Sequence, residues 1–276
     1  MGKFSEKVIL VPFGSTKDAM IAVEQSYNFA NLSKAKLVLL GVSTSRHPFD
    51  QKQFDKVVED VKAKGEVPVE TMVRKGNIYD ELTKVADIIN PMFIVMRIRE
   101  SLGPDKLIGR NIFKMVRQSK HAVITLKGDT FNSGCERILL PLDLSKESRE
   151  KVDKAIHLAK LFEAEIDVVC VSQSKTEVTK LESYMRQAEK VIKDSGVKCD
   201  THMLRGKDIP STIINHAHTV NADLIVIMTQ EKIHLSEMTL WNMGTVAQQL
   251  INESDIPVLS FRPMKRKDTS VGITPY

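Results

Sequence analysis

Several residue patterns are missing from this 276-residue chain, and each absence excludes a class of protein. Its three cysteines, Cys135, Cys170 and Cys199, are odd in number and have no metal-like spacing, which argues against a disulfide framework and for a reducing compartment. No apolar run approaches the ~18–20 residues that span a bilayer, so a membrane is not an expected partner. We therefore expect a soluble, cytoplasmic protein, in which Cys170 is a small core residue.

Aromatic residues are also scarce, at 5% of the chain, whereas 42% of all residues are hydrophobic. A mainly aliphatic core is typical of parallel sheets covered by helices. Runs of charge of one sign are scarce as well, because the net charge is +5 and both signs are interspersed. This pattern gives no reason to expect a nucleic acid partner. The one basic cluster, Lys265–Lys267, lies in a terminal segment, residues 265–276, that we interpret as a flexible solvated tail.

What the chain does contain is an internal repeat. Residues 8–126 reappear, diverged but in the same order, at residues 137–261. The offset between the copies is 129 over the first part and 131 from Thr71 onwards, where Met72 aligns with Met203. Each copy is far longer than one repeat of a solenoid, so we interpret it as a whole domain. At roughly 130 residues, each domain is long enough to bury a core of its own.

Within each copy, short apolar runs alternate with longer stretches of helical spacing. Five strands separated by four helices, twice over, predict an α/β protein with two open, five-stranded parallel sheets flanked by helices. Ser145 and Asp208 are the predicted N-caps of the helices that follow them. The turn-rich segment 128–135 is the predicted linker between a first domain at 1–127 and a second at 136–264. The predicted strands are Lys7–Pro12, Lys36–Val42, Val69–Val73, Met92–Met96, Ala122–Leu126, Arg137–Leu142, Glu165–Val171, Lys198–Leu204, Asp223–Met228 and Pro257–Phe261.

In sheets of this kind, ligands bind beyond the carboxyl ends of the strands, where a helix N-terminus can offer free N–H groups to a phosphate. The segments around these ends resemble a known family. The strand-turn segments ILVPFGST and LLPLDLS, the strand ADLIVIM and the closing IPVLSF are similar to those of the universal stress protein family. The resemblance implies two tandem Rossmann-like domains of the adenine nucleotide alpha hydrolase-like type, which pair with each other within the chain. Whether two such chains pair again into a homodimer stays open.

The resemblance also implies at most one nucleotide site, for ATP with Mg, in the second domain. In ATP-binding members of the family an Asp after the first strand contacts the nucleoside, and a glycine-rich pattern after the fourth strand holds the phosphates. From the residues alone, Asp143 is equally explained as a brace of its strand-to-helix turn, and Thr245 as a helix cap. The residues that the resemblance assigns to the site are Leu142, Asp143, Ser145 and Val171 on the nucleoside side, and Met228, Gly244, Thr245 and Val246 on the phosphate side.

The second copy departs from the family pattern in the segment after its fourth strand. Met228 and Glu231 stand in place of the first two glycines, which removes close backbone approach, and a carboxylate at Glu231 would repel phosphates. The spacing from Glu231 to Gly244 is also longer than in the family. For Trp241, in the same segment, the default interpretation is a core anchor, and the alternatives are a cover of the cleft, a filling of it or an interface residue.

The first copy departs further. Gly14 replaces the Asp, and Arg97 and Glu100 replace the paired glycines, so we predict a degenerate site in the first domain. Two interpretations remain for Arg97, Arg99 and Arg110. They could hold an anion through bidentate contacts, or they could be solvated loop charges that pair with neighbouring acids.

No catalytic constellation stands out, because the phosphate-binding and hydrolase motifs and a nucleophile-base pair are missing. His216 and His218 diverge on a helix, and without a Cys or carboxylate cluster beside them we expect no metal site. We therefore predict a stress-response binding and regulatory module, with slow ATP hydrolysis at most. The alternative is a scaffold without nucleotide binding that acts through an unidentified protein partner or an apolar ligand.

Overall fold

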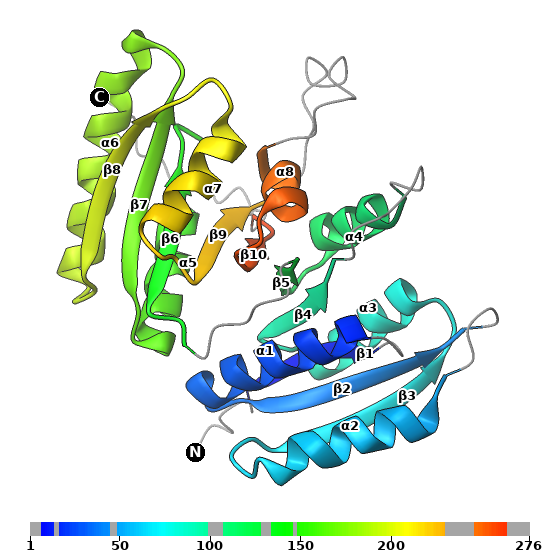
Figure 1. Ribbon diagram of the computed structural model, residues 1–276. Coiled ribbons are helices and arrows are strands. Elements are labelled where there is room, and N and C mark those ends of the chain that lie inside the picture. Colours follow the sequence, from blue (N-terminus) through cyan, green and yellow to red (C-terminus); the bar gives the residue numbers. More distant parts are fainter. Residues whose placement is uncertain are drawn as a thin grey trace, which may run out of the picture.

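The computed structural model describes residues 7–13, 17–44, 49–98, 107–127, 134–145, 148–229 and 246–263, which fold around one sheet of ten strands (Figure 1). The strand order is β3-β2-β1-β4-β5-β10-β9-β6-β7-β8. All ten predicted strands are present, and no strand end differs from the prediction by more than two residues. The strands are β1 (Val8–Phe13), β2 (Lys36–Ser43), β3 (Val69–Lys75), β4 (Phe93–Arg97), β5 (Ala122–Leu126), β6 (Arg137–Leu142), β7 (Glu165–Ser172), β8 (Cys199–Arg205), β9 (Leu224–Met228) and β10 (Val258–Phe261).

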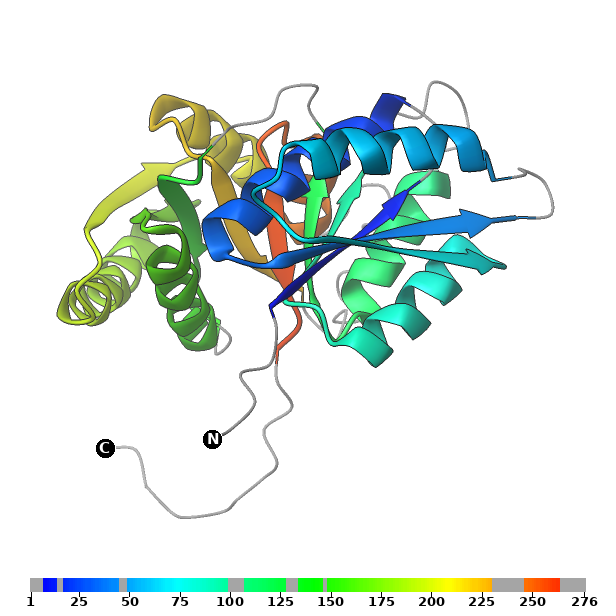
Figure 2. The ribbon, with the colours of Figure 1, turned by 90° about the horizontal axis from the view of Figure 1, so that it is seen from below.

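Helices cover both faces of the sheet, which is why its central strands read as continuous apolar runs. The buried residues of α1, α2, α5 and α6 belong to one core cluster, and those of α3, α4, α7 and α8 belong to the other. Figure 2 shows this arrangement for the first half, with α1 and α2 above the strands and α3 and α4 below them. The helices are α1 (Lys17–Ser33), α2 (Gln51–Ala63), α3 (Ile78–Ile89), α4 (Leu107–Gln118), α5 (Ser148–Phe162), α6 (Lys175–Asp194), α7 (Ile209–Thr219) and α8 (Val246–Glu253).

The two halves of the sheet meet at the antiparallel pair β5 and β10, where Ile124 faces Leu259. All strand pairs within a half are parallel. The core is continuous across this junction, because each cluster contains residues of both halves. Phe162 of α5, for example, lies 5.7 Å from the ring of Phe29 and 6.1 Å from that of Phe93, measured between ring centroids. The predicted pairing within the chain is therefore confirmed.

The pairing of the strands corrects one detail of the repeat. Leu40 pairs with Met72, whereas its counterpart Val169, at an offset of 129, pairs with His202. The offset in β3 and β8 is therefore 130, and the alignment of Met72 with Met203 is wrong by one residue. Such a shift exchanges the two faces of a strand, so the structural counterpart of Met72 is His202.

The ends of two helices can be compared with the predicted caps. Asp208 is the N-cap of α7, where its carboxylate accepts a hydrogen bond from the N–H of Ser211 at 3.3 Å, as predicted. Ser145 is instead hydrogen-bonded to Asp143, and the two residues that separate it from α5 lie outside the described residues. Its role as a cap stays a prediction.

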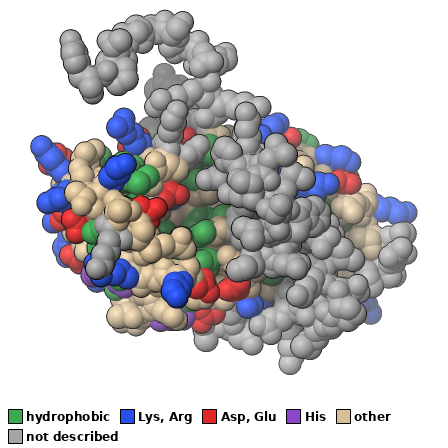
Figure 3. All heavy atoms as spheres, turned by 90° about the horizontal axis from the view of Figure 1, so that it is seen from above, with side chains coloured by type: hydrophobic (Ala, Val, Ile, Leu, Met, Phe, Trp, Pro, Cys, Tyr) green, Lys and Arg blue, Asp and Glu red, His purple; other side chains and the backbone are tan. Residues whose placement is uncertain are grey.

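The surface carries charges of both signs. On the face shown in Figure 3, Lys and Arg side chains alternate with Asp and Glu side chains among the described residues, and hydrophobic side chains show in a hollow between them. In the described part of the chain, no helix combines the length and the apolar character that crossing a membrane requires.

The three cysteines are buried, free thiols. Cys170 is fully buried in the core cluster beneath α5 and α6, which confirms its predicted role as a core residue. Burial raises the pKa of Cys170 and that of Cys199 to about 12, and it raises the pKa of Cys135 as well. Because the thiolate is the reactive form, we expect all three thiols to be unreactive while the protein is folded.

Replacing Phe162 with Ala tests whether the two halves share one core. The side chain is 5% exposed, so its loss should lower the free energy of unfolding by roughly 3–5 kcal/mol. Guanidinium denaturation followed by circular dichroism should show a single transition at a lower midpoint. Ile88→Ala, at a position of α3 that is 72% exposed, is the control and should change the value by less than about 0.5 kcal/mol. Two transitions, of which Phe162→Ala shifts only one, would contradict a shared core.

The raised pKa values of the thiols predict their reactivity. A thiol with a pKa of about 12 is protonated at pH 8, so the native protein should react with an aromatic disulfide reagent only on the timescale of unfolding. In denaturant the same reagent should titrate three thiols at once. Rapid labelling of one cysteine in the native state, identified by peptide mass, would show that its surroundings are open to solvent.

Candidate functional site

The predicted crevice of the second half lies at the carboxyl ends of β6 and its neighbours. β6 lies between β9 and β7, so the strand order reverses beside it, and ligands of open α/β sheets bind at such switch points. The ladder between β6 and β7 has six pairs, whereas that between β6 and β9 has two, which ends at Leu139↔Ile225. The carboxyl ends of β6 and β9 are therefore not paired with each other and can flank a crevice. Leu142, Val171 and Met228 lie at this edge of the sheet, as the sequence predicts.

Asp143 follows β6 directly and is exposed. Its Oδ1 atom accepts a hydrogen bond from the N–H of Ser145 at 3.1 Å and a second one from the Ser145 hydroxyl. This is the Asx-turn geometry that short acidic side chains adopt where a strand turns into a loop. The turn fixes the direction of the carboxylate while leaving the side chain accessible to a ligand. Bracing the turn and contacting a ligand are compatible roles for this residue.

The apolar residues at the edge differ in how much surface they offer. Leu142 is 5% exposed and belongs to the core cluster, and Met228 is 8% exposed. Val171 is only half-buried, so of these three side chains it offers the most surface to the crevice. Gly244 and Thr245 lie outside the described residues. Val246, which begins α8, is 38% exposed.

A buried lysine beside the crevice was not singled out from the sequence. Lys151 of α5 is 8% exposed, and its Nζ atom donates a hydrogen bond to the carbonyl oxygen of Pro141 at 2.7 Å, just before Asp143. Burial is the largest effect on the pKa of Cys170 and raises it. The positive charge of Lys151 lowers this pKa, and the negative charge of Asp143 raises it. Both charges therefore lie near the same thiol. The signal that could have found Lys151 is its counterpart in the repeat, Ala22, which is 2% exposed.

The corresponding edge of the first half is built differently. Phe13 ends β1, and its ring lies 5.1 Å from that of Phe54, which in turn lies 5.1 Å from Phe49. Phe49 covers Gly41 of β2 so closely that a Cβ atom there would lie 2.3 Å from its ring. Aromatic side chains therefore fill the space beside the ends of β1 and β2.

Of the first-half residues considered for an anion site, Arg97 ends β4 and is half-buried. Gly14, Arg99 and Glu100 lie outside the described residues. Arg110 belongs to α4, at a position where only the backbone is described. The two interpretations of these arginines stay open.

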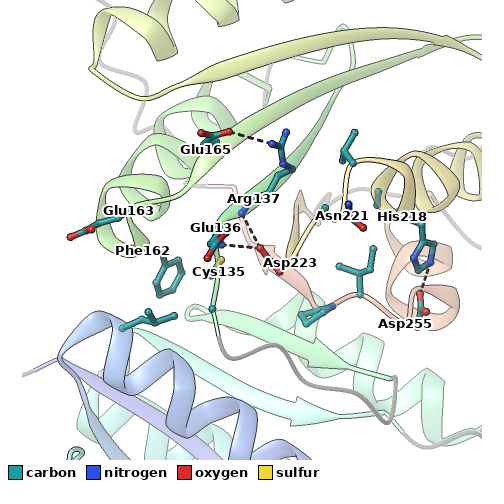
Figure 4. Close-up of a pocket in the computed structure, with 17 residues that line it drawn as sticks. Cys135, Glu136, Arg137, Phe162, Glu163, Glu165, His218, Asn221, Asp223 and Asp255 are labelled. Carbon is teal, nitrogen blue, oxygen red and sulfur yellow. Dashed lines mark hydrogen bonds and ion pairs between the residues drawn. The ribbon is translucent and has the colours of Figure 1, made fainter.

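A cavity of about 1270 Å³ among the described residues lies elsewhere, at the amino ends of the second-half strands (Figure 4). Ion pairs and hydrogen bonds connect the polar residues of its walls. Arg137 lies 3.3 Å from Glu165, and Asp223 accepts hydrogen bonds from the N–H groups of Glu136 and Arg137 at 2.8 and 2.9 Å. These contacts join the starts of β6, β7 and β9, so we assign the walls a structural role.

The two histidines of α7 diverge, as predicted for residues two positions apart on a helix. The Nε2 atom of His218 lies 2.9 Å from Asp255, at the cavity (Figure 4). His216 points to the sheet instead, where its Nε2 atom lies 3.8 Å from Oδ1 of Asp167. Nothing in the sequence joins this carboxylate to the histidine, because β7 and α7 are distant in the chain.

Comparison with known proteins agrees with this architecture. The sequence model of the universal stress protein family matches residues 134–262. A universal stress protein of Methanocaldococcus jannaschii is 30% identical over 149 residues, which are 48% of this chain and 85% of that protein. Among solved structures, a universal stress protein from Archaeoglobus fulgidus aligns with a TM-score of 0.72 at 19% identity, over 94% of this chain and 97% of that one.

A functionally unknown protein from Pseudomonas aeruginosa aligns almost as well, with a TM-score of 0.68 at 18% identity, over 94% of this chain and 93% of that one. At such identities the structural likeness establishes the fold, two consecutive α/β units in one chain. The sequence match to the Methanocaldococcus protein establishes the family: the chain belongs to the universal stress protein family.

Proposed function

We propose that the second half binds an adenine nucleotide of the ATP class, with Mg, in the crevice at the carboxyl ends of β6 and β9. The chain would then act as a cytoplasmic binding and regulatory module in the response to stress, not as a metabolic enzyme. The observation that carries the proposal is the exposed carboxylate of Asp143, fixed by Ser145 at the switch point of the sheet. In ATP-binding members of the family, an Asp at this position contacts the nucleoside.

The surroundings of Asp143 suit a nucleoside. Val171, level with it on the neighbouring strand, offers a half-buried apolar surface to a base. Leu142 is buried, so in this arrangement it would meet the base through its backbone groups. The buried ammonium of Lys151 supplies positive charge near the carboxylate and limits the repulsion between Asp143 and an anionic ligand.

The phosphates would lie toward the N-terminus of α8. Gly244 and Thr245 directly precede this helix, and free N–H groups at a helix start favour an anion. Mg would be held mainly by the phosphates themselves, because this ion keeps much of its water shell and uses few protein ligands. A nucleotide with a shorter phosphate chain would use the same nucleoside contacts.

The side chains at the carboxyl ends of the strands favour the second half over the first as the nucleotide site. In the first half the rings of Phe13, Phe49 and Phe54 pack beside the ends of β1 and β2. In the second half the strand positions of Phe13 and Gly41 are taken by Leu142 and Cys170. We infer that the first half acts as the structural partner that completes the sheet.

Calorimetric titration of the intact chain with ATP and Mg tests the proposal. We expect one site with micromolar affinity, about −8 kcal/mol, and a loss of at least about tenfold, or 1.4 kcal/mol, in Asp143→Ala. Asp153→Ala, which removes an exposed carboxylate from the surface of α5, is the matched control and should bind as the intact chain does. Equal binding by Asp143→Ala and the intact chain would remove Asp143 from the site.

Hydrogen exchange tests where the nucleotide binds. With ATP and Mg present, we expect slower exchange in peptides that cover residues 142–150 and the start of α8, because the ligand would order both segments. Peptides that follow β1 should not change. Protection confined to the first half would contradict the proposal.

One observation favours the alternative of a scaffold without a nucleotide. Met228 occupies the position of the first glycine of the family pattern and is buried, so the backbone there is screened by a side chain. No heat from the intact chain, beside a clear signal from an ATP-binding protein under the same conditions, would establish this alternative.

A further inference from the structure

A buried cluster of Asp167, His202 and His216 lies in the second half, away from the proposed nucleotide crevice. The three side chains come from β7, β8 and α7, and one ligand atom of each lies within 4.8 Å of the others. The Nε2 atom of His202 is 2.8 Å from Oδ1 of Asp167, and that of His216 is 3.8 Å from the same oxygen. The carboxylate itself is 1% exposed.

Two buried atoms of this cluster have no hydrogen-bond partner. Among the described residues, neither Oδ1 of Asp167 nor Nε2 of His216 takes part in a hydrogen bond, although both are buried. The other carboxylate oxygen, Oδ2, accepts a hydrogen bond from Nη1 of Arg137 at 2.7 Å. Because buried polar atoms are almost always satisfied, two atoms without a hydrogen-bond partner in one buried cluster leave a place for a ligand that both could bind.

The fold itself does not require these polar residues. The counterparts in the first half follow from the pairing of β1, β2 and β3 and from the common start of α3 and α7. All four counterparts are apolar. Arg137, Asp167, His202 and His216 correspond to Val8, Val38, Met72 and Val85. Since buried ionic groups can be replaced by well-packed apolar ones without loss of stability, the charged set points to a ligand and not to packing.

We propose that Asp167, His202 and His216 form a binding site for a divalent transition metal of the zinc class. Two imidazoles and a carboxylate are ligands typical of zinc, and a water would complete a four-coordinate shell. Ligand atoms about 2.0–2.2 Å from a tetrahedral ion lie about 3.3 Å apart. The distances of 2.8 and 3.8 Å from Asp167 Oδ1 to the two histidines bracket this value, so small side-chain shifts would admit the ion.

The surroundings of the cluster support the same assignment. Arg137 binds Oδ2 of Asp167 and thereby orients Oδ1 toward the two histidines, as outer partners of metal ligands commonly do. The side chain of His202 is 38% exposed and gives an ion a path from solvent.

The bound metal would join α7 to the sheet. Asp167 lies four residues before Val171 on β7, about 13 Å along the strand, so the metal site and the proposed nucleotide crevice are separate. Its role would be to fix α7 on β7 and β8, independently of any nucleotide.

A titration with metal alone tests the proposal. Tag-free full-length protein, stripped with a chelator, would be titrated with Co²⁺ and followed by the visible absorption of four-coordinate cobalt. We expect one equivalent of cobalt to bind, zinc to displace it, and zinc to raise the Tm by several degrees because it binds only the folded state. No cobalt spectrum and no zinc retained after dialysis would overturn the proposal.

The repeat supplies the variants. His202→Met and His216→Val install the residues that the first half carries at the same places, so both should fold, which circular dichroism would check. Each should weaken cobalt binding by at least about tenfold, because loss of an outer partner alone weakens metal binding that much. His218→Ala is the matched control on the same helix and should bind cobalt as the intact chain does. Undiminished binding by the double variant His202→Met/His216→Val would place the metal elsewhere and refute the assignment.

Discussion

The antiparallel pairing of β5 with β10 is the contact on which the rest of the structure depends. Each half has a sheet of five parallel strands, and in the absence of the other half its last strand would be an unpaired edge. Pairing β5 with β10 leaves neither of these strands unpaired. It also aligns the halves so that helices of each pack against the other. Phe162 reaches across to Phe29 and Phe93 only because the sheets are joined in this way. The junction therefore joins the two halves in one continuous core.

This joint core explains how the two copies could diverge so far. The strands pair in the same way in both halves, with one extra residue between β7 and β8, yet the side chains at equivalent places differ in kind. Ala22 of the first half corresponds to Lys151, and Val38 corresponds to Asp167. The same fold therefore forms with apolar residues at these places in one half and with charged residues in the other.

The sequence was sufficient to predict the strands and the pairing of the halves, because aliphatic runs of strand length and the repeat are local signals. It was not sufficient for the register of β8, where the shared Met72 and Met203 suggested an alignment that the sheet does not follow. The sequence also indicated the position of the proposed crevice, because Asp143 directly follows one predicted strand and Val171 ends the next. It did not reveal the buried partners of these residues, because burial of a lysine in a helix depends on the neighbouring helix and strand.

The same limit explains why the cluster around Asp167 escaped the sequence. Its members lie on β7, β8 and α7, and only the parallel pairing of the two strands and the crossover of α7 bring them together. Once the register is known, a comparison of the two copies identifies these residues, because their counterparts in the first half are apolar. Lys151 and Asp167 lie on opposite faces of the second half, and the first half has a small apolar residue at both places. Since the other copy forms the same fold with apolar residues at both places, we connect each of the two charges with one of the two ligands proposed above.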